Sequence, residues 1–227
     1  MTDALVRCDG AARTYGEGAT ATVALQPTDC EVCPGETIAV AGPSGSGKST
    51  LLHLLAGLDQ PTVGSVTWPG IGDGASLRPG PVAMIFQSPS LLAPLTVLEN
   101  VAFPLILDGL PRQQAERRAR TALERLGLAG LAEKLPDEVS GGQAQRVAAA
   151  RALAGRPRLV LADEPTGQLD RASGAEVVGA LLAAARQSGS ALVVATHDSA
   201  VSERLSLRWE MRDGRLAASP REPAWSH

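Results

Sequence analysis

The stretch that decides the fold reads TIAVAGPSGSGKSTLLHLLAGL, residues 37–58. It starts as an apolar strand, passes through a glycine-rich loop and continues as a helix. The loop GPSGSGKS (Gly42–Ser49) fits the pattern G-x-x-x-x-G-K-[ST] in the context that this pattern requires, a strand before it and a helix after it. Because glycines let successive backbone N–H groups curl around phosphate oxygens, the stretch predicts a site for the phosphates of a nucleotide.

The polar residues of this loop have separate expected roles. Lys48 is expected to reach the terminal phosphates, and Ser49 to offer its hydroxyl to Mg²⁺. Lysine is otherwise almost unused, since Lys134 is the other one in the chain. The residues expected to surround the phosphates are Gly42, Pro43, Ser44, Gly45, Ser46, Gly47, Lys48, Ser49 and Thr50.

A second motif, LVLADE (Leu159–Glu164), is an apolar strand that ends in two adjacent acids. Carboxylates at the carboxyl end of a parallel strand lie where open α/β sheets bind ligands. Asp163 is expected to hold the metal, directly or through its waters. Glu164 points the other way, and we expect it to orient and partly deprotonate a water that attacks the terminal phosphorus. The two motifs together predict a nucleoside triphosphatase.

The remaining chain alternates apolar strands with helical segments, which predicts an α/β fold with a parallel sheet. The first 32 residues contain short strands and turns and predict an antiparallel β annex. A helical stretch is predicted from about Pro94 to Leu135, with breaks near Pro104 and around 108–111.

Two further segments predict loops and hairpins. Residues 61–82 are rich in Gly and Pro, which indicates hairpins and loops, not a linker to another domain. LRWEMRDGRL, residues 207–216, predicts a final hairpin. The tail after it is expected to be frayed.

Charge and hydropathy exclude several functions. The formal net charge of −3 and the pI near 5.7 give no basic footprint for nucleic acid or for a polybasic membrane anchor. No apolar run approaches the roughly 20 residues of a membrane span, and the N-terminus lacks the charged-then-apolar build of a signal peptide. We therefore expect a chain that stays in the cytoplasm.

The three cysteines, Cys8, Cys30 and Cys33, do not make a disulfide framework. Cys30 and Cys33 form a C-x-x-C, but no second pair with metal-ligand spacing follows. Residues three apart in a strand point to opposite faces. We therefore predict no metal or redox role for this pair.

A third motif begins at Val139 and reads VSGGQAQRVAAARAL. A Gly-Gly pair that opens a helix lets an anion approach bare amides at the positive helix end. The motif lies just upstream of LVLADEPTGQLD, and this order and spacing resemble the ATP-binding cassette (ABC) family, whose signature reads LSGGQ; Val139 replaces the usual Leu. The resemblance covers nearly the whole chain.

The resemblance implies a fold, an activity and an assembly. The fold would be a P-loop NTPase of the ABC ATPase type, with a RecA-like parallel-sheet core, an N-terminal antiparallel β subdomain and an α-helical signature subdomain. The chain would hydrolyse ATP with Mg²⁺. In this family the signature of one subunit binds the γ-phosphate held by the other subunit's P-loop. The residues implied in this contact are Ser140, Gly141, Gly142 and Gln143.

Other residues match family elements by position. Tyr15 matches the aromatic that stacks on adenine, and Gln87 matches the glutamine that reaches the Mg²⁺ and the attacking water. Asp170 matches the loop that crosses the dimer interface, and His197 matches the histidine that contacts the γ-phosphate. His53 lies on an apolar helix and is expected to be packed, and His227 is terminal. The implied catalytic residues are Lys48, Gln87, Glu164 and His197, and the implied metal ligands are Ser49, Gln87 and Asp163.

The resemblance also implies partners and a division of the chain. A homodimer, or a heterodimer with a similar ATPase, would work with an integral membrane permease at the cytoplasmic face of the membrane, without nucleic acid. One ABC ATPase domain is expected over 1–220, with the β and P-loop core at about 1–87 and 156–220 and the helical subdomain at about 88–155. Residues 221–227 are expected to be a flexible tail.

Within the family, TLLHLLAGLD, LTVLENVAFPLIL and DEPTGQLD look most like the LolD, MacB and FtsE group, which serves lipoprotein release, macrolide export and cell-division signalling. Gln168 departs from the group, which usually has Asn there, and the segment between Lys48 and Gln87 is shorter. LRPGPVAMIFQ is reminiscent of importer ATPases of the nitrate and taurine type. A binding-protein-dependent importer is therefore an alternative.

Two other classes fit less well. Soluble cassette ATPases that handle DNA or ribosomes usually carry a long coiled-coil insertion or two cassettes, and this sequence has neither. A P-loop kinase or GTPase would leave the signature without a role.

Overall fold

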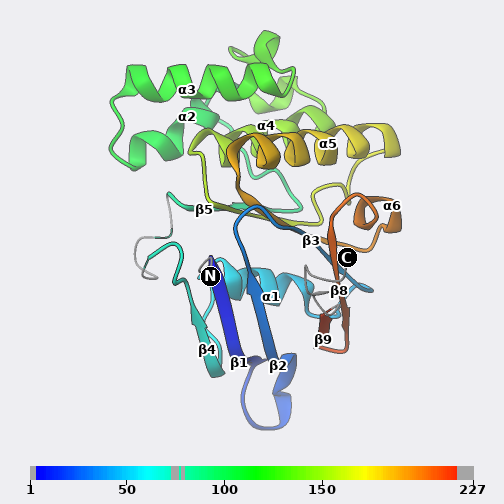
Figure 1. Ribbon diagram of the computed structural model, residues 1–227. Coiled ribbons are helices and arrows are strands. Elements are labelled where there is room, and N and C mark those ends of the chain that lie inside the picture. Colours follow the sequence, from blue (N-terminus) through cyan, green and yellow to red (C-terminus); the bar gives the residue numbers. More distant parts are fainter. Residues whose placement is uncertain (1–3, 73–76, 78–79, 219–227) are drawn as a thin grey trace, which may run out of the picture.

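The computed structural model describes residues 4–72, 77 and 80–218. A three-stranded antiparallel sheet has the strand order β2-β1-β4. It consists of β1 (Val6–Tyr15), β2 (Thr22–Val32) and β4 (Val63–Thr67), with a short 3₁₀ turn, η1 (Gly18–Thr20), between β1 and β2. Figure 1 shows it in the lower part of the molecule, below helices α2 to α5. The predicted annex is therefore confirmed, and β4 shows that the 61–82 segment contributes a strand to it.

A second sheet forms the centre, in the order β5-β6-β7-β3-β8-β9. Its first five members run parallel, and β9 pairs antiparallel with β8, as the predicted final hairpin requires. The strands are β3 (Thr37–Ala41), β5 (Val82–Ile85), β6 (Leu159–Asp163), β7 (Ala191–Thr196), β8 (Leu207–Arg212) and β9 (Arg215–Ala218).

The central sheet buries both of its faces, because successive residues of its strands alternate between two cores. In β6, Val160 packs on the side of the helical region, while Leu161 packs toward the antiparallel sheet. Helix α1 (Lys48–Leu55) lies between the two sheets, and α5 (Arg171–Ser188) covers the opposite face. The short helix α6 (Ser199–Ser202) follows β7. This double burial explains why the strands read as continuous apolar runs.

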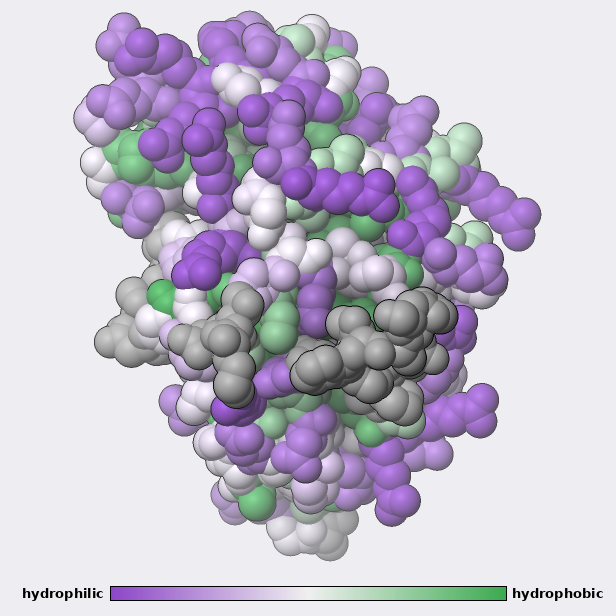
Figure 2. All heavy atoms as spheres, in the orientation of Figure 1, coloured by the Kyte–Doolittle hydropathy of each residue, from purple (hydrophilic) through white to green (hydrophobic). Residues whose placement is uncertain are grey.

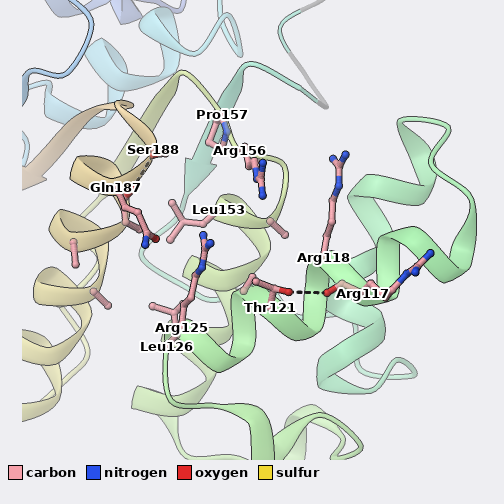
Figure 3. Close-up of a pocket in the computed structure, with 15 residues that line it drawn as sticks. Arg117, Arg118, Thr121, Arg125, Leu126, Leu153, Arg156, Pro157, Gln187 and Ser188 are labelled. Atoms are coloured by element: carbon pink, nitrogen blue, oxygen red, sulfur yellow. Dashed lines mark hydrogen bonds between the residues drawn. The ribbon is translucent and has the colours of Figure 1, made fainter.

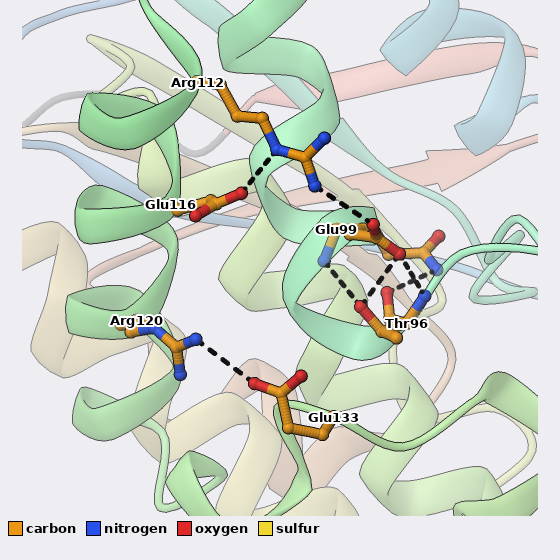
Figure 4. Close-up of polar contacts among 7 residues, drawn as sticks. Thr96, Glu99, Arg112, Glu116, Arg120 and Glu133 are labelled. Atoms are coloured by element: carbon orange, nitrogen blue, oxygen red, sulfur yellow. Dashed lines mark hydrogen bonds and ion pairs between the residues drawn. The ribbon is translucent and has the colours of Figure 1, made fainter.

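The helical region consists of α2 (Val97–Leu107), α3 (Arg112–Arg125), two short 3₁₀ turns, η3 (Ala129–Leu131) and η4 (Pro136–Glu138), and α4 (Gly141–Ala154). α2 begins with a capping box, in which Thr96 accepts from the Glu99 amide and Glu99 accepts from the Thr96 amide (Figure 4). Figure 2 shows that the upper part of the molecule, over these helices, is mostly hydrophilic on the face in view.

The predicted helix break near Pro104 is wrong, whereas the break at 108–111 is present. α2 runs through Pro104 to Leu107. Proline removes one helical hydrogen bond, but three residues of α2, Val97, Val101 and Leu105, are buried in the core. Packing therefore outweighs the lost bond so close to the helix end.

None of the helices in the described residues is long and apolar enough to cross a membrane. None of the three cysteines forms a disulfide. Cys30 lies opposite Cys8 in the β1–β2 pairing, and Cys33 follows the end of β2. Contact with Cys8, together with burial, raises the pKa of the Cys30 thiol, which disfavours the reactive thiolate.

Candidate functional site

The glycine-rich loop is held against two other strands of the chain. β3 ends at Ala41 and delivers Gly42; a Cβ on Gly42 would lie 2.2 Å from the carbonyl oxygen of Met211 in β8. Gly47 has a φ of +98°, and a Cβ there would lie 2.3 Å from the carbonyl oxygen of Ala24 in β2. Only glycine fits at these two positions. The loop is therefore shaped before any ligand arrives.

Lys48 begins α1 and folds back over this loop. Its side chain is 6% exposed, and Nζ donates to the carbonyl oxygens of Gly42 and Pro43, both at 2.9 Å. Nζ also lies 3.4 Å from Glu164 Oε1. A buried ammonium held in this way is a fixed positive charge beside the loop.

Three strand ends bring the charged residues together. Register pairs Ala41 with Thr196 and Asp163 with Ala195, so β3, β6 and β7 end at one edge of the sheet. Glu164 follows β6 there, and its Oε2 lies 2.8 Å from Nδ1 of His197, which follows β7. Glu164 thus contacts Lys48 through one oxygen and His197 through the other. Residues separated by more than a hundred positions form one polar cluster.

The backbone of Glu164 is unusual for its residue type. Its φ is +45°, in the left-handed region that costs a non-glycine residue roughly 1–2 kcal/mol. Two hydrogen bonds hold it: its N–H donates to the carbonyl of Ala195, and its carbonyl accepts from the Gly167 N–H, both at 3.0 Å. This turn directs the carboxylate into the cluster, and backbone strain of this kind is concentrated at functional sites.

The residues expected to hold Mg²⁺ suit a hard cation. Asp163 Oδ1 is buried and has no hydrogen-bond partner among the described residues, so it can accept a metal or a metal-bound water. Gln87 follows β5 and reaches Gly167, since a Cβ on that glycine would lie 3.2 Å from Gln87 Nε2. Within the described residues no cluster of three or more His, Cys, Asp or Glu side chains forms a separate metal site. A metal with few protein ligands, as expected when phosphates supply the others, fits this arrangement.

Tyr15 ends β1 and is held by two residues that the sequence interpretation missed. Its ring is 40% exposed, its hydroxyl donates to Asp59 at 2.8 Å, and the Arg13 guanidinium lies 4.6 Å from the ring centre. Arg13 also pairs with both carboxylate oxygens of Asp59, at 2.9 Å each. The spacing of Arg13 and Tyr15, two apart in a strand, could have indicated their contact; nothing local indicated Asp59.

The charge of Asp59 is secured by these contacts. Partial burial favours its protonated form, but hydrogen bonds from the Tyr15 hydroxyl and the Gln60 amide, together with the charge of Arg13, hold its pKa below the ordinary value. Asp59 therefore stays an acceptor for the Tyr15 hydroxyl at neutral pH, and the ring is fixed in direction.

The signature residues open α4. Ser140 accepts from the Gln143 amide at 3.3 Å, and Gln143 Oε1 accepts from the Ser140 amide at 2.9 Å, which completes a capping box. Asp170 caps α5 beside it: a Cβ on Gly142 would lie 3.3 Å from the Ser173 side chain, whose hydroxyl donates to Asp170 at 2.6 Å. In the described part of the chain no hydrogen bond or ion pair joins residues 140–143 to 42–50. The signature and the P-loop of one chain are therefore not bonded to each other.

Comparison with known proteins places the chain in a family. Residues 25–167 match the model of the ABC transporter family. This chain belongs to the ABC transporter ATPases. It hydrolyses ATP.

Individual relatives agree with this assignment. The chain is 41% identical over 225 residues to the lipoprotein-releasing system ATP-binding protein LolD of Shewanella sp. (strain MR-4), covering 96% of this chain and 97% of that protein. The dimeric ATP-binding cassette MJ0796, solved bound to ADP and Pi in a post-hydrolysis state, superimposes with a TM-score of 0.84 at 35% identity, covering 94% of this chain and 98% of that one. The protein cbiO1 of Clostridium perfringens, part of the ABC transporter complex cbiONQ, superimposes with a TM-score of 0.83 at 28% identity, covering 95% of this chain and 87% of that one.

In this ABC ATPase, α4 also holds the segment that contains Gln87. Gln145 is buried and donates to the Phe86 carbonyl at 3.0 Å, and Arg151 donates to the carbonyls of Pro89 and Ser90 at 2.8 and 2.9 Å. Burial lowers the pKa of Arg151. One rigid helix thus joins the signature to the segment around Gln87. The sequence interpretation missed both tethers, because their partners are backbone groups about 60 residues away.

Proposed function

We propose that this ATPase is the energy-supplying subunit of a lipoprotein-release type exporter, in which two copies close on two Mg²⁺-ATP and drive a separate membrane protein. The observation that carries the proposal is the cluster of Lys48, Glu164 and His197 at one sheet edge, beside a glycine loop shaped for phosphates. The identity to the lipoprotein-releasing LolD supports the choice of exporter.

In the hydrolytic step each member of the cluster has its own task. Glu164 orients a water and accepts its proton, since the carboxylate is held by a positive charge on one side and an imidazole on the other. Lys48 turns from the loop carbonyls to the terminal phosphate and neutralises it, and His197 contacts the γ-phosphate. Ser49, Asp163 and Gln87 would hold Mg²⁺, which would neutralise charge on the phosphate oxygens. Tyr15 stacks on adenine.

The second half of each site comes from the other subunit. Ser140, Gly141, Gly142 and Gln143 offer amides at a helix N-terminus to the γ-phosphate of the partner's ATP, and Asp170 lies at the same interface. The dimeric arrangement of the similar cassette MJ0796 supports this assembly.

A membrane subunit is proposed to dock beside α2. Three apolar side chains near the end of this helix are exposed: Phe103, Ile106 and Leu107, the last at 65%. Pro104 and Leu105 of the same helix line a 260 Å³ cavity together with Met84 and Arg151. Docking there would press on the segment that Arg151 holds, which would link the permease to Gln87. The chain would then lie peripherally on the cytoplasmic face of the membrane, with 1–87 and 156–220 as its β and P-loop core and 88–155 as its helical subdomain.

Glu164→Gln tests the proposal. It keeps the shape of the side chain but removes the base, so we expect ATP hydrolysis to fall by at least about 100-fold while ATP binding persists and a closed dimer accumulates. Hydrolysis within a few-fold of the original chain would remove Glu164 as the base. Sedimentation with and without ATP measures the dimer.

The same variant identifies the partner when it is purified with ATP from detergent-solubilised membranes. A membrane protein with few spans and a large external domain is expected. If a permease of many spans with a binding protein is found instead, the chain serves an importer and not an exporter. Soluble partners alone would contradict the transporter role.

A further inference from the structure

Helix α3 carries two sets of arginines with different surroundings. Arg112 pairs with Glu116 at 2.7 Å and with Glu99 at 3.4 Å, and Arg120 pairs with Glu133 at 3.2 Å (Figure 4). Arg118 and Arg125 lie on another face of the helix. Neither makes an ion pair or a side-chain hydrogen bond within the described residues. The helix thus separates neutralised guanidinium groups from free ones.

The free arginines line a pocket of about 820 Å³ between α3, the end of α4 and the second half of α5. Arg156, which follows α4, joins them, and it too has no ion pair or side-chain hydrogen bond in the part of the chain that is described. Figure 3 shows Arg118, Arg125 and Arg156 extending around the same space. No Asp or Glu is among the residues that line the pocket. Arg117 lines the pocket as well, so four arginines and no acid surround this cavity, while Asp108 and Arg118 both line the neighbouring one.

Helix C-termini could in principle neutralise these cations, because α4 and α5 both end at the pocket. Two carbonyls near these helix ends already accept from other groups. The Leu153 carbonyl accepts from the Arg156 amide at 3.0 Å, and the Ala184 carbonyl accepts from the Ser188 hydroxyl at 2.8 Å. The guanidinium groups donate to none of them. Arg118, Arg125 and Arg156 are exposed, so their guanidinium groups are hydrated in the free protein and are open to an anionic ligand.

We propose that this pocket binds a phosphate ester. Guanidinium forks match phosphate oxygens in a bidentate way, and three of them give a net positive rim. The remaining lining is partly apolar, with Leu126, Leu153 and Ala180, so the organic part of the ligand would lie against it. The volume falls in the range of sites for small organic molecules.

The pocket is separate from the ATP site. Pro157, which precedes β6, lines the pocket, whereas Asp163 ends β6 at the catalytic edge. At about 3.3 Å per residue the two lie roughly 20 Å apart. α4 connects the regions, with the signature at its start and Leu153 near its end.

The test uses the intact chain saturated with Mg²⁺-ADP, so that the P-loop does not bind the probes. Glycerol 3-phosphate and dihexanoyl phosphatidylglycerol are titrated by calorimetry, and vesicles of phosphatidylcholine with or without phosphatidylglycerol are tested by co-sedimentation. Binding is compared between Arg118→Gln/Arg125→Gln and the matched variant Arg112→Gln/Arg120→Gln, which removes the same charge from the same helix.

We expect affinity to fall at least about tenfold in the first variant, which loses two charge-assisted contacts to the phosphate, and less than about twofold in the second. Binding of both soluble probes supports a free phosphate ester, and binding of phosphatidylglycerol alone supports a lipid headgroup. No binding of any probe, or equal losses in both variants, would overturn the proposal. Arg156→Gln, at an exposed position, repeats the test if the double variant fails to fold.

Discussion

Two helices of this ATPase begin where a phosphate is expected, and they begin in opposite ways. α1 has no capping side chain; it follows Gly47, whose left-handed backbone is wedged against β2, and its first residue, Lys48, is buried. α4 closes its own capping box with Ser140 and Gln143, and open space lies above Gly141. Gly42 and Gly47, before α1, are thus required by the chain's own packing, whereas no described atom within 4 Å requires a glycine at position 141.

The largest expected effect comes from adding one methyl group to each helix start. Gly47→Ala should lower the free energy of unfolding by about 3 kcal/mol, from left-handed strain and the clash with the Ala24 carbonyl. Gly141→Ala should change it by less than about 1 kcal/mol, because nothing lies within 4 Å of the added Cβ. Urea denaturation measures both. Equal stability of the two variants would break the comparison.

The next test concerns charge at the start of α4. Gln143→Glu preserves the capping box, so stability should hold, but a carboxylate would face the partner's γ-phosphate. In the Glu164→Gln background the ATP-dependent dimer should weaken by about tenfold or more. Glu99→Gln in the box of α2 is the control and should leave the dimer unchanged. Sedimentation in the presence of ATP measures the dimerisation of each variant. A dimer unaffected by Gln143→Glu would mean that the start of α4 does not face a phosphate.

A smaller effect, on the KM for ATP, is expected at Tyr15, the residue proposed to stack on adenine. Its supporting contacts come from Arg13 and Asp59 of the same chain. Tyr15→Leu should raise the KM for ATP about tenfold through lost stacking. Asp59→Asn should raise it about threefold, since it weakens the contacts that hold the ring and Arg13. Steady-state ATPase assays should show kcat unchanged in both. A lower kcat with an unchanged KM would assign Tyr15 a different role.

The smallest expected effect is a difference in the pH dependence of stability between the capping boxes of α2 and α4. Hydrogen bonds from Thr96 lower the pKa of Glu99 below its ordinary value of 4.5. Burial raises this pKa, and the charge of Arg112 lowers it further. A lowered folded-state pKa contributes stability that is present above the unfolded pKa and lost as pH falls through the folded one. Glu99→Gln should remove this acid-side dependence below about pH 4.5, worth at most about 0.5 kcal/mol because the side chain is 38% exposed. Thermal melts across pH measure it, and no such dependence is expected from the neutral Gln143.

The sequence predicted those features that lie in a continuous stretch. The glycine loop, the acidic end of β6, the antiparallel annex and the final hairpin were each legible from neighbouring residues. Pro104 was misjudged because a local rule about proline was applied where burial of α2 decides. The burial of α2 depends on residues that are distant in the sequence, so the residues next to Pro104 do not reveal it.

The candidate site divides in the same way. Glu164 and His197 were predicted as site residues, but their contact at 2.8 Å and the approach of Lys48 depend on the register of three strands. Asp59, Gln145 and Arg151 were missed, since their partners lie at least 40 residues away. Such contacts are invisible to spacing rules.

By itself, the sequence determined that this protein has a P-loop, two catalytic-type acids and an ABC signature, because each is a short run whose backbone geometry follows from its own residues. Only the tertiary structure decided which charges meet. It paired Lys48 and His197 with Glu164, closed the start of α4 with its own side chains, and left Arg118 and Arg125 facing a cavity without an acid. Electrostatic contacts depend on distance in space, and the packing of sheets and helices sets that distance.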